Sequence, residues 1–199
     1  SPCCGWSDPY RDTIVVLPTP PPAITIQTAT GSGETCEGSP VVFVAQLQNF
    51  APNPSITWLV NGTPAGTGVS FILSNPQPGD QVQAIAQGNT PCSRRQPIPS
   101  NTITLTVHDR PQIQPLATGG CFTISGNLIP GELITLSATV TGGQPPYRYY
   151  WDLGDGRGAV GNPATVMYPS AGTYRVRLVV EDDNGCTSSN TVPVSYTHL

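Results

Sequence analysis

Six cysteines are the residues of this sequence with the most specific chemistry. Four of them stand far apart, at Cys36, Cys92, Cys121 and Cys186, and only two histidines accompany them. A structural zinc site needs its ligands in closely spaced pairs. Disulfides are instead typical of small proteins in oxidising compartments. The cysteine pattern therefore predicts disulfide bonds and an extracellular setting.

Acidic side chains offer a second kind of chemistry. Asp152 and Asp155 lie near each other in sequence, and Asp183 ends an acidic run at 181–183. Carboxylate oxygens are what Ca²⁺ binds, with six to eight ligands per ion. The alternative is that Asp155 and the following Gly156 form a tight turn between two strands. Calcium at Asp152, Asp155 and Asp183 is therefore one interpretation beside a plain turn, and no other cofactor is expected.

Three tyrosines next to Pro145-Pro146 form a third candidate site. Tyr147, Tyr149 and Tyr150 could stack on sugar rings or contact a collagen-like polymer. In a strand, however, successive side chains point to opposite faces. Tyr150 must then lie on the face opposite to Tyr149 and Trp151, so the three rings cannot share one surface.

No arrangement of residues predicts catalysis. The sequence holds no Gly-x-Ser-x-Gly, no His-Glu-x-x-His and no phosphate-binding glycine loop. His108 stands beside Asp109 without the third partner that a catalytic triad needs. A net charge of -4 with no lysine argues against nucleic acid as a partner, and no apolar stretch is long enough for membrane insertion.

Composition indicates which elements carry these residues. Charged residues make up only 10% of the 199, while proline (23) and glycine (21) recur throughout. Almost no stretch free of both is long enough for three helical turns. Such a chain predicts an all-β fold of short strands and many turns.

An internal repeat divides the chain in two. In each copy a tryptophan stands between two cysteines, a glycine follows that tryptophan by 21 residues, and the tripeptide Ser-Asn-Thr follows the second cysteine. The landmarks are Cys36, Trp58, Gly79, Cys92 and Ser100 in the first copy, and Cys121, Trp151, Gly172, Cys186 and Ser189 in the second. These matched landmarks in one order predict two copies of one module.

Alternation within the copies predicts a β-sandwich. Residues 174–180 place apolar side chains on one face and Arg175 and Arg177 on the other, as in a half-buried strand. Trp58 and Trp151 fall within apolar runs and are predicted to pack inside the sandwich. A disulfide between the two cysteines of each copy would close a loop of more than fifty residues. Such a bond would stabilise the copy by about 4 kcal/mol.

Proline marks the boundaries. We expect the tail of a truncated upstream module at 1–17, a proline-rich linker at 18–22, modules at 23–109 and 110–195, and a possible artefactual tail at 196–199. The segment at 1–17 would contribute one C-terminal strand. Either Cys3 or Cys4 would then have lost its partner through truncation.

The second copy carries the motif Trp-Asp-Leu-Gly-Asp-Gly at 151–156, followed by a Tyr-x-x-x-Gly-x-Tyr-x-Val strand from Tyr168. This pattern resembles the PKD domain, over residues 112–195. The first copy lacks both aspartates of the turn. It is similar to the PKD-like or immunoglobulin-like modules found in tandem in large bacterial surface proteins. The resemblance implies two tandem immunoglobulin-like β-sandwiches of about seven strands each and a secreted or surface location.

These observations favour a non-catalytic module pair that acts as a spacer or stalk and in adhesion. Its expected partners are other proteins, an extracellular polymer and neighbouring repeat modules. The alternative is a pair of accessory modules that hold a polysaccharide or collagen-like substrate for a secreted hydrolase. Tyr147, Tyr149 and Tyr150 are the residues that favour this alternative.

Overall fold

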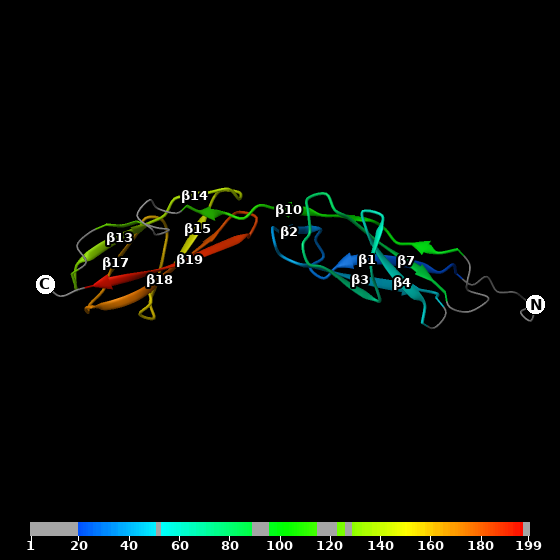
Figure 1. The fold of residues 1–199 in the computed structure, drawn as a ribbon, viewed down its shortest axis with the longest axis horizontal. Coiled ribbons are helices and arrows are strands. Elements are labelled where there is room, and N and C mark those ends of the chain that lie inside the picture. The colour runs from blue at the N-terminus through cyan, green and yellow to red at the C-terminus, as the bar shows by residue number, and fades with distance from the viewer. Residues whose placement is uncertain (1–19, 51–52, 89–95, 115–122, 126–128, 197–199) are drawn as a thin grey trace, which may run out of the picture. The chain divides into compact units, whose positions relative to one another are not determined.

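Strands joined by turns and loops make up the described chain (Figure 1). The computed structural model describes residues 20–50, 53–88, 96–114, 123–125 and 129–196. The chain divides into two units, residues 1–107 and 108–199. Within the described ranges, no helix is long and apolar enough to cross a membrane.

The first unit contains two main sheets. One has the strand order β1-β3-β6, and the other has the order β5-β4-β7-β8, with β9 also paired to β7. A further pair joins β2 to β10. The strands are β1 (Ala23–Thr28), β2 (Glu34–Cys36), β3 (Val41–Gln48), β4 (Ser55–Val60), β5 (Thr63–Thr67), β6 (Ser70–Leu73), β7 (Gln81–Gln87), β8 (Ile98–Pro99), β9 (Ile103–Thr104) and β10 (Thr106–His108).

Alternate side chains of these strands fill the first core. In β7 the buried residues are Val82, Ala84 and Ala86, while the residues between them are more exposed. These small side chains leave room for a ring cluster in which Phe71 lies 5.7 Å from Trp58 and 6.2 Å from Phe43 between ring centroids. Period-two burial of this kind is what a sandwich interior requires.

The second unit repeats the two-sheet plan. One sheet has the order β12-β13-β17, the other β16-β15-β18-β19, and β11 pairs with β14. The strands are β11 (Gln112–Ile113), β12 (Thr123–Ser125), β13 (Leu133–Ser137), β14 (Val140–Thr141), β15 (Arg148–Asp152), β16 (Gly158–Val160), β17 (Ala164–Met167), β18 (Gly172–Glu181) and β19 (Thr187–Tyr196).

Strand β18 lies at the centre of the second unit. Val176, Leu178 and Val180 are fully buried, whereas Arg175 and Arg177 are exposed. The sequence therefore predicted this strand and its faces correctly. Trp58 and Trp151 are 0% and 2% exposed, so both are core residues as predicted.

The predicted fold class, all-β with immunoglobulin-like sandwiches, is confirmed for the two units. His108 is the last residue of strand β10. Tyr196 is paired with Gly172 as the last residue of β19, so the regular strand includes the first residue of the predicted tail. The upstream segment 1–17, Cys3, Cys4, Cys92 and Cys121 lie outside the described residues.

Candidate functional site

Each unit fixes its tryptophan by the same hydrogen bond. Trp58 Nε1 donates to the carbonyl oxygen of Gly68 at 2.8 Å, and Trp151 Nε1 donates to that of Gly161 at 2.8 Å. In both units the acceptor lies ten residues after the donor. A buried indole N–H needs such a partner, because leaving it unpaired costs about 1–3 kcal/mol. The two units therefore share this hydrogen bond as well as their sequence landmarks.

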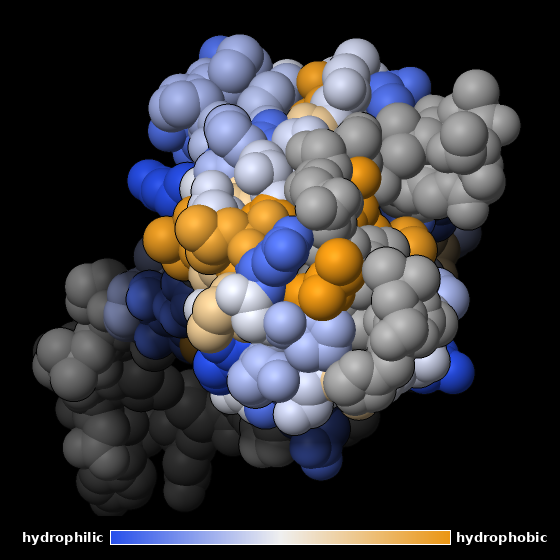
Figure 2. Space-filling view, turned by 90° about the vertical axis from the view of Figure 1, so that its left-hand side faces the viewer, coloured by the Kyte–Doolittle hydropathy of each residue, from blue (hydrophilic) through white to orange (hydrophobic). Residues whose placement is uncertain are grey.

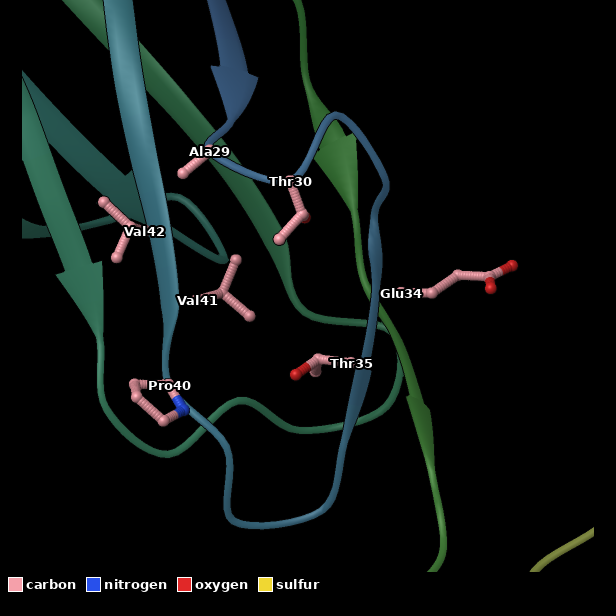
Figure 3. Close-up of a pocket in the computed structure, with 7 residues that line it drawn as sticks. All are labelled: Ala29, Thr30, Glu34, Thr35, Pro40, Val41 and Val42. Atoms are coloured by element: carbon pink, nitrogen blue, oxygen red, sulfur yellow. The ribbon is translucent and has the colours of Figure 1, made fainter. Parts of the chain in front are cut away.

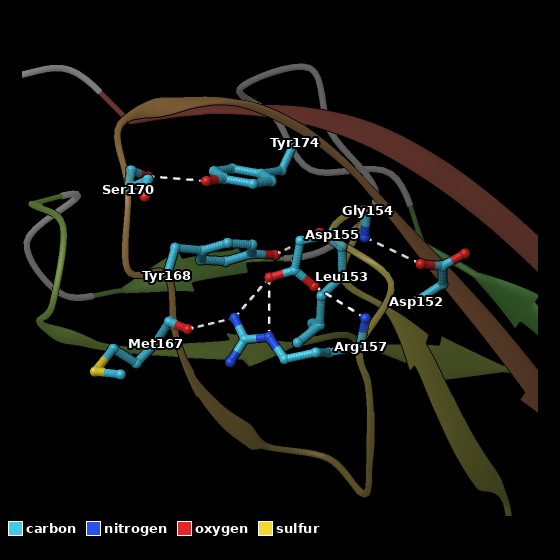
Figure 4. Close-up of polar contacts among 9 residues, drawn as sticks. All are labelled: Asp152, Leu153, Gly154, Asp155, Arg157, Met167, Tyr168, Ser170 and Tyr174. Atoms are coloured by element: carbon cyan, nitrogen blue, oxygen red, sulfur yellow. Dashed lines mark hydrogen bonds and ion pairs between the residues drawn. The ribbon is translucent and has the colours of Figure 1, made fainter.

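The turn at 153–157 is held by an ion pair (Figure 4). The Arg157 guanidinium donates to Asp155 Oδ2 from Nε at 2.9 Å and from Nη2 at 2.6 Å, and Nη2 also donates to the Met167 carbonyl at 2.6 Å. The side-chain hydrogen bond from Arg157 lowers the pKa of Asp155 below its ordinary value. Leu153 N closes the turn by donating to the Arg157 carbonyl at 3.0 Å. The Asp155 carboxylate is thus committed to a turn.

Two tyrosines support this turn from within the unit. Tyr168 is fully buried, and its hydroxyl donates to the Leu153 carbonyl at 2.9 Å. The ring of Tyr174 lies 4.3 Å from that of Tyr168 between centroids, and its hydroxyl donates to Ser170 O at 2.9 Å. Figure 4 shows both rings, tilted by 35° to each other, beside the Asp155–Arg157 pair. The contacts of the Trp-Asp-Leu-Gly-Asp-Gly motif and of the two tyrosines that follow it therefore stabilise the turn at 153–157.

The carboxylates proposed for calcium do not converge. Asp152 Oδ1 accepts from Gly154 N at 3.0 Å, and Asp182, only 1% exposed, accepts from Gln144 N and Cys186 N at 3.0 and 2.8 Å. Asp183 is exposed beside it. In the part of the chain described, no three His, Cys, Asp or Glu side chains are close enough to hold a metal ion. Calcium at these positions stays a prediction from the sequence.

The three candidate tyrosines separate as the alternation predicted. Tyr147 and Tyr149 pack against the core of their unit, edge to face with ring centroids 6.5 Å apart, and Tyr147 Oη donates to Gly142 O at 2.7 Å. Tyr150 is 42% exposed on the opposite face of β15. Of the three tyrosines, Tyr150 alone is exposed enough for its ring to stack on a ligand.

Tyr150 has apolar neighbours on the outer face. It is paired with Val160 of β16 on one side and with Val179 of β18 on the other. Val160 is 72% exposed. A shallow, open hollow beside this row is lined by Tyr147, Arg148, Tyr149, Tyr150, Val160, Gly161 and Asn162. We call Tyr150, Val160 and Val179 the outer apolar row.

Sequence reasoning missed Val160 and Asn162 at this surface. The register of β15 against β16 brings Val160 opposite Tyr150, and no local signal gives that register. Asn162 is held in place because its side chain bonds both backbone groups of Ala138, donating at 2.7 Å and accepting at 2.9 Å. No local pattern in the sequence indicates this partner.

A second hollow lies in the first unit (Figure 3). Its lining residues are Ala29, Thr30, Glu34, Thr35, Pro40, Val41 and Val42, and its volume is about 110 Å³. The Glu34 carboxylate points away from it (Figure 3). Sites for small organic ligands usually measure roughly 300–1,000 Å³. This hollow is therefore too small for such a ligand.

Apolar side chains also gather on one surface of the molecule, with polar residues around them (Figure 2). In the second unit Leu133 of β13 and Met167 of β17 are cross-strand neighbours, and they are 66% and 39% exposed. The first unit has a similar pair, since Val42 of β3 faces Ile72 of β6 and the two are 36% and 57% exposed. Each unit thus exposes an apolar pair on its own three-stranded sheet, β1-β3-β6 or β12-β13-β17.

The described cysteines are oxidised. Cys36 and Cys186 both take part in disulfide bonds, and Cys186 is fully buried. This agrees with the prediction of disulfide bonds, and the pairing within each copy stays a prediction. The partners expected within each copy, Cys92 and Cys121, lie outside the described residues.

Comparison with known proteins agrees with this architecture. The family model of the PKD domain matches residues 123–196. The decoration protein of Escherichia phage T5 is 34% identical over 95 residues, which cover 42% of this chain and 58% of that protein. The chain thus spans little more than half of this relative. The resemblance to the PKD domain is confirmed for the second unit.

Two solved structures match parts of this chain. The N-terminal eight Ig domains of the Down Syndrome Cell Adhesion Molecule match 87% of this chain and 24% of that chain, with 15% identity and a TM-score of 0.51. The PKD1 domain of the Vibrio cholerae metalloprotease PrtV matches 39% of this chain and 93% of that chain, with 24% identity and a TM-score of 0.34. The first of these supports an immunoglobulin-like fold.

Proposed function

We propose that this chain, whose residues 123–196 match the PKD domain, is a non-catalytic pair of structural modules exposed at the outer surface of a cell or virus particle. Its role is to space other domains from that surface and to take part in adhesion or protein–protein contact. The observation that carries the proposal is the repetition of one closed sandwich, with its own core and the same tryptophan hydrogen bond in each copy.

Three further features support this proposal. The polar groups of the sequence motif are committed to turns and strand contacts, as the Asp155–Arg157 pair shows. Disulfide bonds at Cys36 and Cys186 fit an oxidising environment. The phage T5 relative is itself named a decoration protein.

Surface labelling of the source cells or particles tests this function. Antibodies raised against residues 123–196 are expected to label intact, unpermeabilised material, because an outer-surface module is accessible without opening it. An antibody to an internal protein serves as the control for intactness. Labelling that appears only after permeabilisation would contradict an outer-surface role.

A second candidate function is polymer binding, and the outer apolar row favours it. Tyr150 and Val160 are exposed neighbours beside a shallow hollow that also presents the Arg148 and Asn162 side chains. An exposed aromatic ring with polar groups around it is the kind of surface on which sugar rings stack. Under this alternative the modules hold an insoluble polymer near a catalytic domain elsewhere in a longer protein.

Replacing Tyr150 by alanine distinguishes the two candidates. If the row binds polymer, we expect the chain to be retained on chitin, cellulose or collagen, and Tyr150→Ala to reduce retention at least tenfold. Leu133→Ala is the matched control, since Leu133 is exposed on the other sheet. No retention on any of the three, or equal retention by both variants, would exclude polymer binding through this row.

A further inference from the structure

Cys36 lies at one end of the first sandwich. It is the last residue of β2, which pairs with β10. Thr106 N donates to the Gly33 carbonyl at 2.9 Å, immediately before β2 begins. The bond joins the start of β2 to the start of β10, and both strands extend away from it. The two strands are therefore parallel. Cys36 therefore lies beyond the level of Thr106, and Ser39 N donates to its carbonyl at 2.9 Å as the chain turns back.

The segment that contains Cys92 is attached at the other end. It leaves the described chain after Gly88, directly beyond Gln87, which is paired with Ser55. It returns at Gln96, and Ile98 is then paired with Ala86. Both attachment points thus lie at the Gln87 end of β7.

The registers give the distance between these two ends. Gln81 is paired with Thr104 at the start of β7, and six residues separate Gln81 from Gln87, which is about 20 Å of strand. From Thr104 the path continues to Thr106, crosses to Gly33 and runs on to Cys36. Each of these steps leads further away from the Gln87 end of β7. Cys36 therefore lies on the order of 30 Å from the Gly88 attachment point along the strand axis.

The chain cannot cover this distance. Cys92 is four residues from Gly88 and four from Gln96. Four extended residues reach at most about 14 Å. The Cα atoms of a disulfide are separated by roughly 4.4–6.8 Å, so the combined reach is about 21 Å and falls short by roughly 10 Å. Cys36 is nevertheless disulfide-bonded.

We propose that Cys36 is bonded to a cysteine outside its own repeat, residues 23–109. This replaces the expected Cys36–Cys92 pairing. The bond forms when two thiols lose two protons and two electrons, which thiol–disulfide exchange transfers to the disulfide of an oxidoreductase. It covalently ties the first repeat to another part of the chain or to a neighbouring copy, and it closes no loop inside the repeat.

Peptide mapping without reduction tests this pairing. Cleavage before aspartate separates the cysteines of the full chain into different peptides: 12–79 holds Cys36, 80–108 holds Cys92, 109–151 holds Cys121, 183–199 holds Cys186, and 1–7 holds Cys3 and Cys4. Free thiols are first blocked with N-ethylmaleimide. We expect 12–79 to be linked to a peptide other than 80–108. A linked 12–79/80–108 pair, or a blocked free Cys36, would overturn the proposal.

A pair of variants gives a second, independent measurement. In Cys92→Ser, Cys36 is expected to remain oxidised and unlabelled, because Cys92 is not its partner. In Cys36→Ser, the newly labelled thiol is expected in a peptide other than 80–108. Labelling of Cys36 in the Cys92→Ser variant, or of Cys92 in the Cys36→Ser variant, would restore the pairing within the repeat.

Discussion

Replacing Trp151 by alanine is expected to lower the free energy of unfolding of the second unit by about 3–5 kcal/mol. The side chain is 2% exposed and lies in a core with Leu178 and Val166. Its removal leaves a large cavity and also leaves the Gly161 carbonyl without its donor. Domains of this size are stable by only about 5–15 kcal/mol, so the loss is a large fraction of the total.

Hydrogen exchange read by mass spectrometry measures this effect unit by unit. Because the two cores are separate clusters, protection is expected to fall within β15, β18 and β19 and to stay unchanged in the first unit. Trp151→Phe keeps a ring but loses the N–H, and should fall between wild type and alanine. A loss below about 1 kcal/mol for Trp151→Ala would show that the indole is not central to the core.

Replacing Gly154 by alanine is expected to destabilise the same unit by about 2–5 kcal/mol, from backbone strain and steric overlap together. Gly154 has φ +76°, and an added Cβ would lie 2.6 Å from the oxygen and 2.7 Å from the nitrogen of Arg175. Both atoms belong to the backbone of β18, which cannot move without disturbing its pairing to β15 and β19.

Gly156 provides the matched control within the same turn. It has φ +87°, yet a Cβ there meets nothing within 4 Å. Gly156→Ala should therefore show only the cost of the left-handed backbone, about 1–2 kcal/mol. Denaturant unfolding of the two full-length variants gives the difference. Equal losses of unfolding free energy in the two variants would mean that the close approach of Gly154 to β18 does not contribute to stability.

Much of this fold follows from local patterns. The alternation at 174–180 predicted which side of β18 is buried, and the spacing around Trp58 and Trp151 predicted two copies of one sandwich. Alternation also separated Tyr150 from Tyr149. These inferences succeed because the period of a strand is set by its backbone, independently of the rest of the chain.

The remaining features depend on contacts between distant segments. Gly154 touches Arg175, and Val160 faces Tyr150, only because of the registers that the folded sheet adopts. The equivalence of the cysteines in sequence suggested pairing within each repeat, yet the strand lengths place Cys36 far from the attachment points of the Cys92 segment. Sequence spacing gives the order of such residues but not the distances between them.

The tryptophan hydrogen bond has a consequence for how such chains can lengthen. Donor and acceptor are ten residues apart in both units, so they belong to one short stretch of sequence. A segment that is copied to another position therefore brings both the donor and the acceptor of this hydrogen bond with it. Duplication or exchange of whole modules can therefore add length without requiring a matching change elsewhere in the chain.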